Sequence, residues 1–313
     1  MSSDVYLGDE ISSDGSNRQN IQRRVSKGNG KISEIMSMLE KTSVGVHYFK
    51  IAMLLRESIF LNSVLTNSEV WYGLTSADID LLEAVDKDLL RRIYKVPNST
   101  PIAGLYLESG IMRIGTLKAR RVNFLHYLLK LDKSDMLSRV FYAQWEHAQK
   151  QDWVEQVQKD LRDFGMPRDL ETIQAKSEYV FKNLTKKKAK EFELRSLIEM
   201  KNTKSKSKMK NLNYPKLEMQ TYLEELDANL ASSVVKFRLR MAHFDENYPD
   251  QGPPKPCPLC GNHMDTQSMS FQCAKIREKI PDIGIYEDLF KSDVSKDLAK
   301  ATKYILEIRN NEE

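Results

Sequence analysis

TSADIDLLEAVDKDLLRRIYKVP, residues 75–97, decides the fold class, because it shows a complete helix pattern from start to stop. Thr75 or Ser76 can cap the first turn, and Asp78 places a carboxylate where the helix dipole favours one. Pro97 then prevents the helix from continuing. One apolar stripe runs along this segment, formed by Ile79, Leu82, Leu89 and Ile93. The stretch therefore predicts an amphipathic helix.

Similar patterns recur along most of the chain, so the sequence predicts a mostly α-helical fold. Gly28 and Gly30 are expected to loosen or break the first helix. The segment 47–65 is apolar on nearly all sides and is expected to form a central, buried helix. Residues 4–11 predict a short strand, the only β element expected. The predicted helices span about residues 17–40, 47–65, 75–96, 100–108, 114–131, 134–149, 151–163, 168–200, 215–229, 231–243 and 293–309.

Two stretches interrupt the helical pattern. KNTKSKSKMKN, residues 201–211, is low in complexity and in apolar residues, which predicts a mobile linker. NYPDQGPPKP, residues 247–256, carries too many prolines for a helix. It leads the chain to the cysteines.

Composition excludes several classes of protein. The 313 residues include no apolar run of about eighteen, so we expect no membrane span. The first residues lack the basic and apolar segments of a secretory signal. Three cysteines are too few for a disulfide framework. Together these features predict an intracellular protein whose cysteines bind metal or stay free.

Positive charge is concentrated in one segment. Residues 176–210 hold twelve Lys or Arg and four Glu, a net charge of +8, whereas the whole chain has +4. Such a concentration is typical of a surface that binds a polyanion. The alternative is a solvated helix face that runs into a lysine-rich loop. The candidate phosphate contacts in this segment are Lys186, Lys187, Lys188 and Lys190.

All the cysteines of the chain lie within CPLCGNHMDTQSMSFQC, residues 257–273. Cys257 and Cys260 have the C-x-x-C spacing that wraps a short turn around a metal ion, and Cys273 follows thirteen residues later. Zinc takes four ligands, or three and a water molecule. The alternative is a cysteine pair without metal.

Several segments resemble one family of proteins, the reverse transcriptases of non-LTR (LINE-like) retrotransposons. VYLGDEISSDGSNRQNIQRRVSKGNGKISEIMSML, residues 5–39, resembles the end of the palm and the start of the thumb. Residues 55–101 resemble the thumb and the region after it. Residues 105–131, residues 141–165 and the cysteine cluster also look like the family.

The resemblance implies a thumb-like helical bundle, a helical connector and a small knuckle-like segment. It divides the chain into a palm remnant at 1–15, a thumb-like region at 16–110, a connector with the basic helix at 111–200, a flexible basic linker at 201–213, a helical pair at 214–250, and the knuckle with a final helix at 251–313.

The resemblance also implies a partner. In a thumb, Arg91, Arg92, Arg120 and Arg121 would face the template–primer duplex and hold phosphates without reading sequence. The expected partner is RNA or an RNA–DNA hybrid. Solvated helix faces are the alternative for these arginines. The sequence predicts no oligomeric state.

The family's cysteine cluster usually reads C-x2-C-x7-H-x4-C, which places its histidine at Ser268 of this chain. His263 is the nearest substitute. The predicted zinc site is therefore Cys257, Cys260, His263 and Cys273, with three thiolates and a water as a second possible set.

Catalysis is not expected. Reverse transcriptases hold two divalent ions with clustered aspartates, two of them adjacent, and this sequence has no Asp-Asp pair. In the family these aspartates precede the strand that residues 4–11 resemble. We therefore expect a non-catalytic nucleic-acid-binding fragment. The alternative is a helical protein-interaction scaffold, derived from a decayed element, without nucleic-acid binding.

Overall fold

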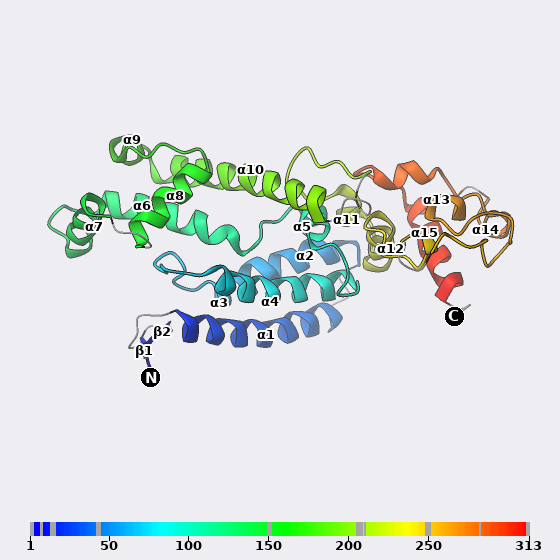
Figure 1. The fold of residues 1–313 in the computed structure, drawn as a ribbon, viewed down its shortest axis with the longest axis horizontal. Coiled ribbons are helices and arrows are strands. Elements are labelled where there is room, and N and C mark those ends of the chain that lie inside the picture. The colour runs from blue at the N-terminus through cyan, green and yellow to red at the C-terminus, as the bar shows by residue number, and fades with distance from the viewer. Residues whose placement is uncertain are drawn as a thin grey trace. The chain divides into compact units, whose positions relative to one another are not determined.

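Helices dominate the structure, which is a computed structural model (Figure 1). It describes residues 3–6, 9–12, 17–41, 45–148, 152–204, 209, 211–247, 252–281 and 283–310. Within these ranges the only sheet is an antiparallel pair near the N-terminus, in which β1 (Ser3–Tyr6) pairs with β2 (Asp9–Ser12). The mostly α-helical prediction is confirmed. The β element expected near residues 4–11 is also present, as two short strands rather than the single strand predicted.

The chain forms two compact units, each built from segments distant in sequence. Unit 1 comprises residues 1–35, 55–87 and 112–196, and unit 2 comprises residues 36–54, 88–111 and 197–313. Four helices contribute residues to both units: α1 (Arg18–Lys41), α2 (Tyr48–Leu55), α4 (Ser76–Tyr94) and α10 (Glu178–Lys204). The domains predicted from the sequence, by contrast, are each one continuous stretch of the chain.

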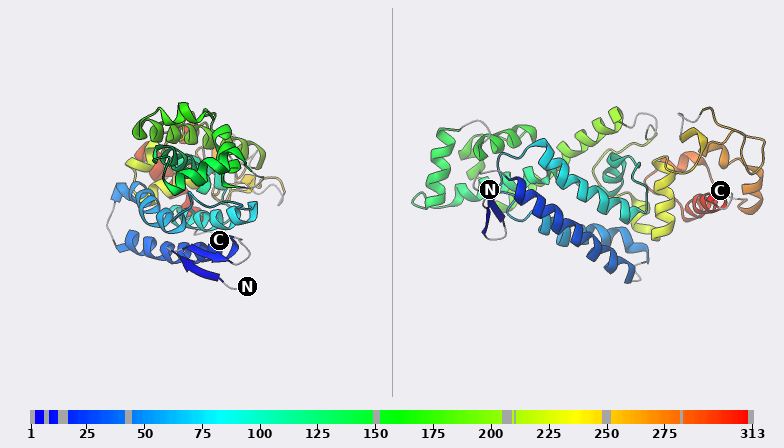
Figure 2. Two further views of the ribbon diagram at one scale, coloured as in Figure 1. Left: turned by 90° about the vertical axis from the view of Figure 1, so that its left-hand side faces the viewer. Right: turned by 60° about the horizontal axis from the view of Figure 1, so that its bottom comes forward.

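Unit 1 has a helical core in which α7 (Met136–Glu146), α8 (Trp153–Asp163) and α9 (Leu170–Gln174) pack on α6 (Leu117–Lys130) (Figure 2). Aspartates begin three of these helices, because their carboxylates accept backbone N–H groups of the first turn: Asp135 before α7, Asp152 before α8 and Asp169 before α9. The further elements of this unit are η2 (Arg56–Leu61), α3 (Asn62–Val64) and η3 (Ile114–Thr116).

Helix α1 continues through Gly28 and Gly30, so the prediction that these glycines break it is wrong. Gly28 is needed for close packing: a Cβ built there would lie 2.9 Å from Val85 Cγ1 and 3.1 Å from Val64 Cγ2. Gly30 faces open space. The packing of α1 against these valines compensates for the low helix propensity of glycine.

The predicted helix 47–65 is helical but not uniform. It consists of η1 (Gly45–His47), α2 (Tyr48–Leu55), the π-helix η2 and α3. Arg56, the first residue of η2, is buried and donates hydrogen bonds of 2.7 and 2.6 Å to the Asp86 carboxylate. A charged side chain is thus buried in an otherwise apolar segment because it has a partner on α4.

Unit 2 contains a buried carboxylate, Glu108, near the end of α5 (Ile102–Ser109). It accepts hydrogen bonds from Arg238 (2.8 Å), Tyr214 (2.6 Å) and Tyr222 (2.9 Å), and all four side chains are almost fully buried. The helix α12 also packs along α15. The elements of this unit include α5 (Ile102–Ser109), α11 (Thr221–Glu225), α12 (Ala228–Arg238), η4 (Asp245–Asn247), α13 (Gln267–Ser270), α14 (Ala274–Lys279), η6 (Tyr286–Phe290) and α15 (Lys296–Asn310).

The predicted linker 201–211 differs from the structure where the structure describes it. Residues 201–204 belong to α10, while residues 205–208 and 210 lie outside the described residues. Met209 and Leu212 are buried, with exposed fractions of 1% and 2%. Because lysines dominate the composition of this segment, the sequence pattern does not reveal that Met209 and Leu212 are buried. No helix in the described ranges is long and apolar enough to cross a bilayer.

Candidate metal centre

The cysteine segment begins with a short ribbon that turns back on itself. Pro256 and Met264 form an antiparallel bridge, so residues 255–257 run beside 263–265. The N–H of Gly261 donates to the Cys257 carbonyl at 2.8 Å and closes the turn between them. Gly261 has a φ of +68°, a left-handed conformation that glycine adopts without steric cost. The sequence therefore forms a tight loop that presents both cysteines of the C-x-x-C pair.

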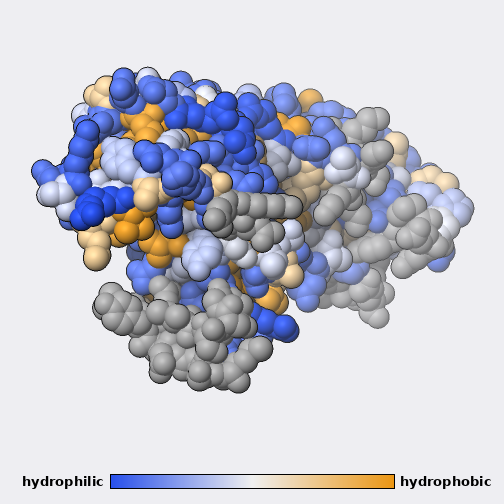
Figure 3. Space-filling view, turned by 60° about the vertical axis from the view of Figure 1, so that its left-hand side comes forward, coloured by the Kyte–Doolittle hydropathy of each residue, from blue (hydrophilic) through white to orange (hydrophobic). Residues whose placement is uncertain are grey.

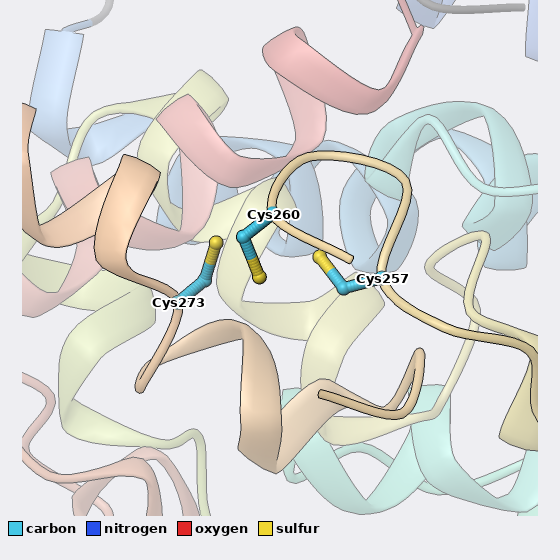
Figure 4. Close-up of side chains that lie close together, drawn as sticks. All are labelled: Cys257, Cys260 and Cys273. Atoms are coloured by element: carbon cyan, nitrogen blue, oxygen red, sulfur yellow. The ribbon is translucent and has the colours of Figure 1, made fainter. Parts of the chain in front are cut away.

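Three thiols converge at this loop. Their Sγ atoms all lie within 4.8 Å of one another, and the close-up shows the three side chains gathered around a common space (Figure 4). Cys257 comes from the ribbon, Cys260 from the turn, and Cys273 from the residue that precedes α14. All three are free cysteines. The convergence brings together residues up to sixteen positions apart in sequence.

The thiol group fits a zinc ion in both chemistry and size. Zn–S bonds of about 2.3 Å in a tetrahedron separate sulfur atoms by roughly 3.8 Å, so the thiols need only small movements to bind. Thiolates are soft ligands that bind zinc well. The hard cations magnesium and calcium take oxygen ligands instead. Three sulfur ligands leave the fourth position for a water molecule or a further side chain.

The environments of the thiols differ. Cys257 and Cys273 are buried, whereas Cys260 is half-buried. A hydrogen bond from the backbone of Asn262 lowers the pKa of Cys260, helped by the neighbouring thiols. Burial raises the pKa of Cys273 to about 11. Metal binding at this group must therefore release protons, because zinc binds thiolates.

The predicted fourth ligand, His263, is not part of the converging group. Its backbone carbonyl accepts the N–H of Cys257 at 2.5 Å, but no ring nitrogen of His263 lies in the set of ligand atoms within 4.8 Å. Ser268, at the family's histidine position, lies in the first turn of α13 with its Oγ 3.3 Å from Thr266 Oγ1. Of the four predicted metal ligands, the structure brings together the three cysteines.

A buried ion pair supports the ribbon, and sequence reasoning missed it. Arg309 on α15 forms two hydrogen bonds to Asp265, and its guanidinium lies 4.2 Å from the centre of the Phe244 ring. The Asp265 carboxylate also accepts the N–H of Asp245 at 3.2 Å. No motif in the sequence connects two residues so far apart.

The lysines predicted to contact phosphate lie on α10, next to the line of residues that this helix buries. Lys186 and Lys187 are exposed and Lys190 is half-buried, and none of the three has a carboxylate within ion-pair distance among the described residues. Lys188 instead pairs with Glu191 at 3.0 Å. The helix is anchored at four-residue intervals by Phe181, Thr185, Ala189, Glu193 and Leu197.

The two arginines of α6 have structural partners. Arg121 is only 7% exposed and its Nε donates to Asp160 at 2.8 Å, so its position does not fit the predicted phosphate contact. A buried ion pair of this kind fastens α6 to α8. Arg120 is half-buried and donates to the Leu65 carbonyl at 2.8 Å, with its pKa lowered by burial.

The other predicted pair, Arg91 and Arg92, belongs to unit 2. Arg92 is exposed and pairs with Asp88 one turn earlier at 3.0 Å, while Arg91 is half-buried. An exposed pair at this spacing contributes little to stability and leaves Arg92 able to exchange partners.

Comparison of the chain with protein-family models, curated proteins and solved structures finds no match.

Proposed function

We propose that the chain is a zinc-binding protein in which Cys257, Cys260 and Cys273 hold one ion. The convergence of the three Sγ atoms within 4.8 Å is the observation that carries this proposal. The sequence predicts His263 as the fourth ligand, but its ring lies outside the group, so the present geometry favours a water molecule. The ion would join the ribbon and its turn to the start of α14.

Cobalt substitution tests the ligand set, because cobalt(II) reports thiolate ligands through charge-transfer absorption. We expect a tetrahedral cobalt spectrum with thiolate bands that weaken in each single Cys→Ser variant. Zinc should displace the cobalt and erase the bands. A spectrum typical of octahedral cobalt with oxygen ligands, unchanged in the Cys273→Ser variant, would contradict the proposal.

We further propose that the chain binds RNA or an RNA–DNA hybrid without catalysis, as a fragment of a non-LTR retrotransposon reverse transcriptase. The exposed and unpaired Lys186 and Lys187 on α10 support this proposal, because they can approach phosphates without first breaking an ion pair. Lys190, one turn further along, extends the same cationic surface. The absence of an Asp-Asp pair from the sequence supports binding over polymerisation.

Fluorescence anisotropy with labelled RNA across a range of salt concentrations tests this second proposal. Lys186→Glu with Lys187→Glu should weaken binding and flatten the slope of log affinity against log salt by about 1.4–1.8, because each lost contact contributes roughly 0.7–0.9. Lys133→Glu with Lys159→Glu changes the charge equally at two other exposed lysines of unit 1 and is the matched control. Equal effects of the two double variants would contradict a specific role for α10.

A helical protein-interaction scaffold is the second candidate function, and α7 favours it. Met136, Leu137 and Val140 on this helix are 81%, 47% and 50% exposed, which is unusual for large apolar side chains. Hydrophobic patches lie among hydrophilic residues on the side of the molecule that carries α7 (Figure 3). A scaffold would show no affinity for RNA at low salt, and the anisotropy measurement therefore separates the two functions.

A further inference from the structure

A hollow in unit 1 lies between α6 and the first turns of α10. Its volume of about 370 Å³ is within the usual range of small-molecule sites. One face of α6 supplies most of the wall, since its residues recur at helical spacing: Arg120, Asn123, Phe124, Tyr127 and Lys130. The start of α10 supplies Glu178 and Lys182.

The wall of the hollow contains an aromatic platform. The rings of Phe124 and Tyr127 stack with centroids 5.8 Å apart and planes 21° from parallel. Phe124 is held in turn by the edge of Trp153. Tyr127 is 54% exposed, so solvent reaches one side of the platform, while Phe124 and Trp153 pack on its other side. A fixed, exposed ring of this kind is the surface on which proteins stack unpaired nucleobases.

A row of charged residues on α10 begins at the hollow that contains this platform. Glu178, Lys182, Lys186 and Lys190 follow at four-residue intervals, so they form one row along the helix. The first two members line the hollow. Glu178 forms an ion pair with Lys182, which offsets its charge. Lys130 contributes a further cation from α6.

Polarity also distinguishes the hollow from an apolar docking groove. The amide of Asn123 and the guanidinium of Arg120 lie in the same wall as the rings. A nucleotide has a flat base, polar edges and a phosphate, which match the rings, the amide and the cations respectively. The amide oxygen of Asn123 is buried and has no hydrogen-bond partner among the residues that the structure describes, and a purely apolar peptide would leave it unpaired.

We propose that this hollow binds one unpaired nucleotide of a single-stranded RNA segment. The base stacks on Tyr127, and the adjoining phosphates follow Lys182, Lys186 and Lys190 along α10. A paired base cannot occupy the site, because duplex stacking covers both of its faces. This inference rests on the proposed nucleic-acid binding and adds to it the chemical form of the ligand.

Two labelled oligonucleotides of equal length test the inference by anisotropy. One is a single-stranded RNA with all its bases, and the other is an abasic strand with the same number of phosphates. The unmodified protein should prefer the base-bearing strand. Tyr127→Leu should weaken binding of that strand by about 5- to 150-fold and leave the abasic strand unaffected, because it removes stacking and no charge. Tyr127→Phe keeps the ring and should retain the preference.

The salt dependence separates this site from the lysine row. Tyr127→Leu should leave the salt slope unchanged, whereas Lys186→Glu with Lys187→Glu should flatten it for both strands. Equal binding of the base-bearing strand by Tyr127→Leu and by the unmodified protein would overturn the stacking site. It would leave the proposed phosphate contacts of the lysine row unaffected. If the unmodified protein binds neither strand at low salt, the nucleic-acid function and this inference both fail.

Discussion

Arg309 grips Asp265 through two parallel hydrogen bonds, from Nη1 to Oδ1 at 2.6 Å and from Nη2 to Oδ2 at 2.7 Å. Asp265 is the last residue of the ribbon that presents the C-x-x-C pair, and Arg309 lies near the end of the final helix. The pair is largely shielded from water. It therefore holds the ribbon against α15 independently of any metal ion.

Removing Arg309 should destabilise unit 2 strongly. Arg309→Ala leaves the buried Asp265 carboxylate without its partner, a change that typically costs about 3–5 kcal/mol. Lys300→Ala, on the same helix, breaks an exposed ion pair with Asp297 and is the matched control, with an expected cost below about 1 kcal/mol. Urea denaturation measures both free energies. Similar costs for the two variants would show that the Arg309 pair is no more important than a surface pair.

The two glycines of α1 should respond in opposite directions to alanine. Gly28→Ala places a methyl group against two stiff β-branched side chains and should cost about 1–3 kcal/mol. Gly30→Ala meets open space and should stabilise the protein by about 0.5–1 kcal/mol through helix propensity. Thermal denaturation of the pair checks this. Stabilisation by both substitutions would mean that α1 does not pack closely at Gly28.

Sequence patterns found the parts of the fold that depend on local rules. Thr75 caps α4 as predicted: its Oγ1 accepts the N–H of Asp78 at 3.2 Å, and its own N–H donates to the Asp78 carboxylate at 3.0 Å. The N-cap rule needs only residues three apart, so the sequence displays it directly. The spacing of Cys257 and Cys260 is visible for the same reason.

These local rules do not predict contacts between residues that are far apart in sequence. The Glu108–Arg238 ion pair joins residues 130 positions apart, and Arg309–Asp265 joins residues 44 apart. Each charged residue looks like an ordinary surface position until its partner is known. The hollow beside Tyr127 was missed similarly, because its walls come from two helices that no sequence pattern pairs.

Alkaline pH should destabilise unit 2 partly through Tyr286. Burial raises the pKa of this phenol to about 12 from the ordinary 10.0. Its contribution to stability is therefore complete below pH 10, where the phenol is neutral in both states, and declines as the pH rises from 10 to 12. Tyr286→Phe should flatten the fall of unfolding free energy in that window, by at most roughly 1.4 kcal/mol per pH unit. An unchanged pH profile would show that Tyr286 ionises equally in the folded and unfolded states.

Substitutions at the two candidate fourth ligands should separate them. Ser268→His restores the histidine of the family's cysteine pattern and should raise zinc affinity. His263→Ala should change the affinity little, because its ring lies outside the thiol group. Competition with a chromophoric zinc chelator measures both. A large loss of affinity in His263→Ala would establish His263 as the ligand that the sequence predicts.

Native mass spectrometry of the purified chain is the most direct test of the central claim, that the three converging cysteines bind zinc. We expect one zinc ion per chain in the unmodified protein and none in Cys257→Ser or Cys273→Ser. Bound zinc should also protect all three thiols from alkylation until a chelator is added. A metal-free chain in zinc-containing buffer, with all three thiols freely alkylated, would contradict the account.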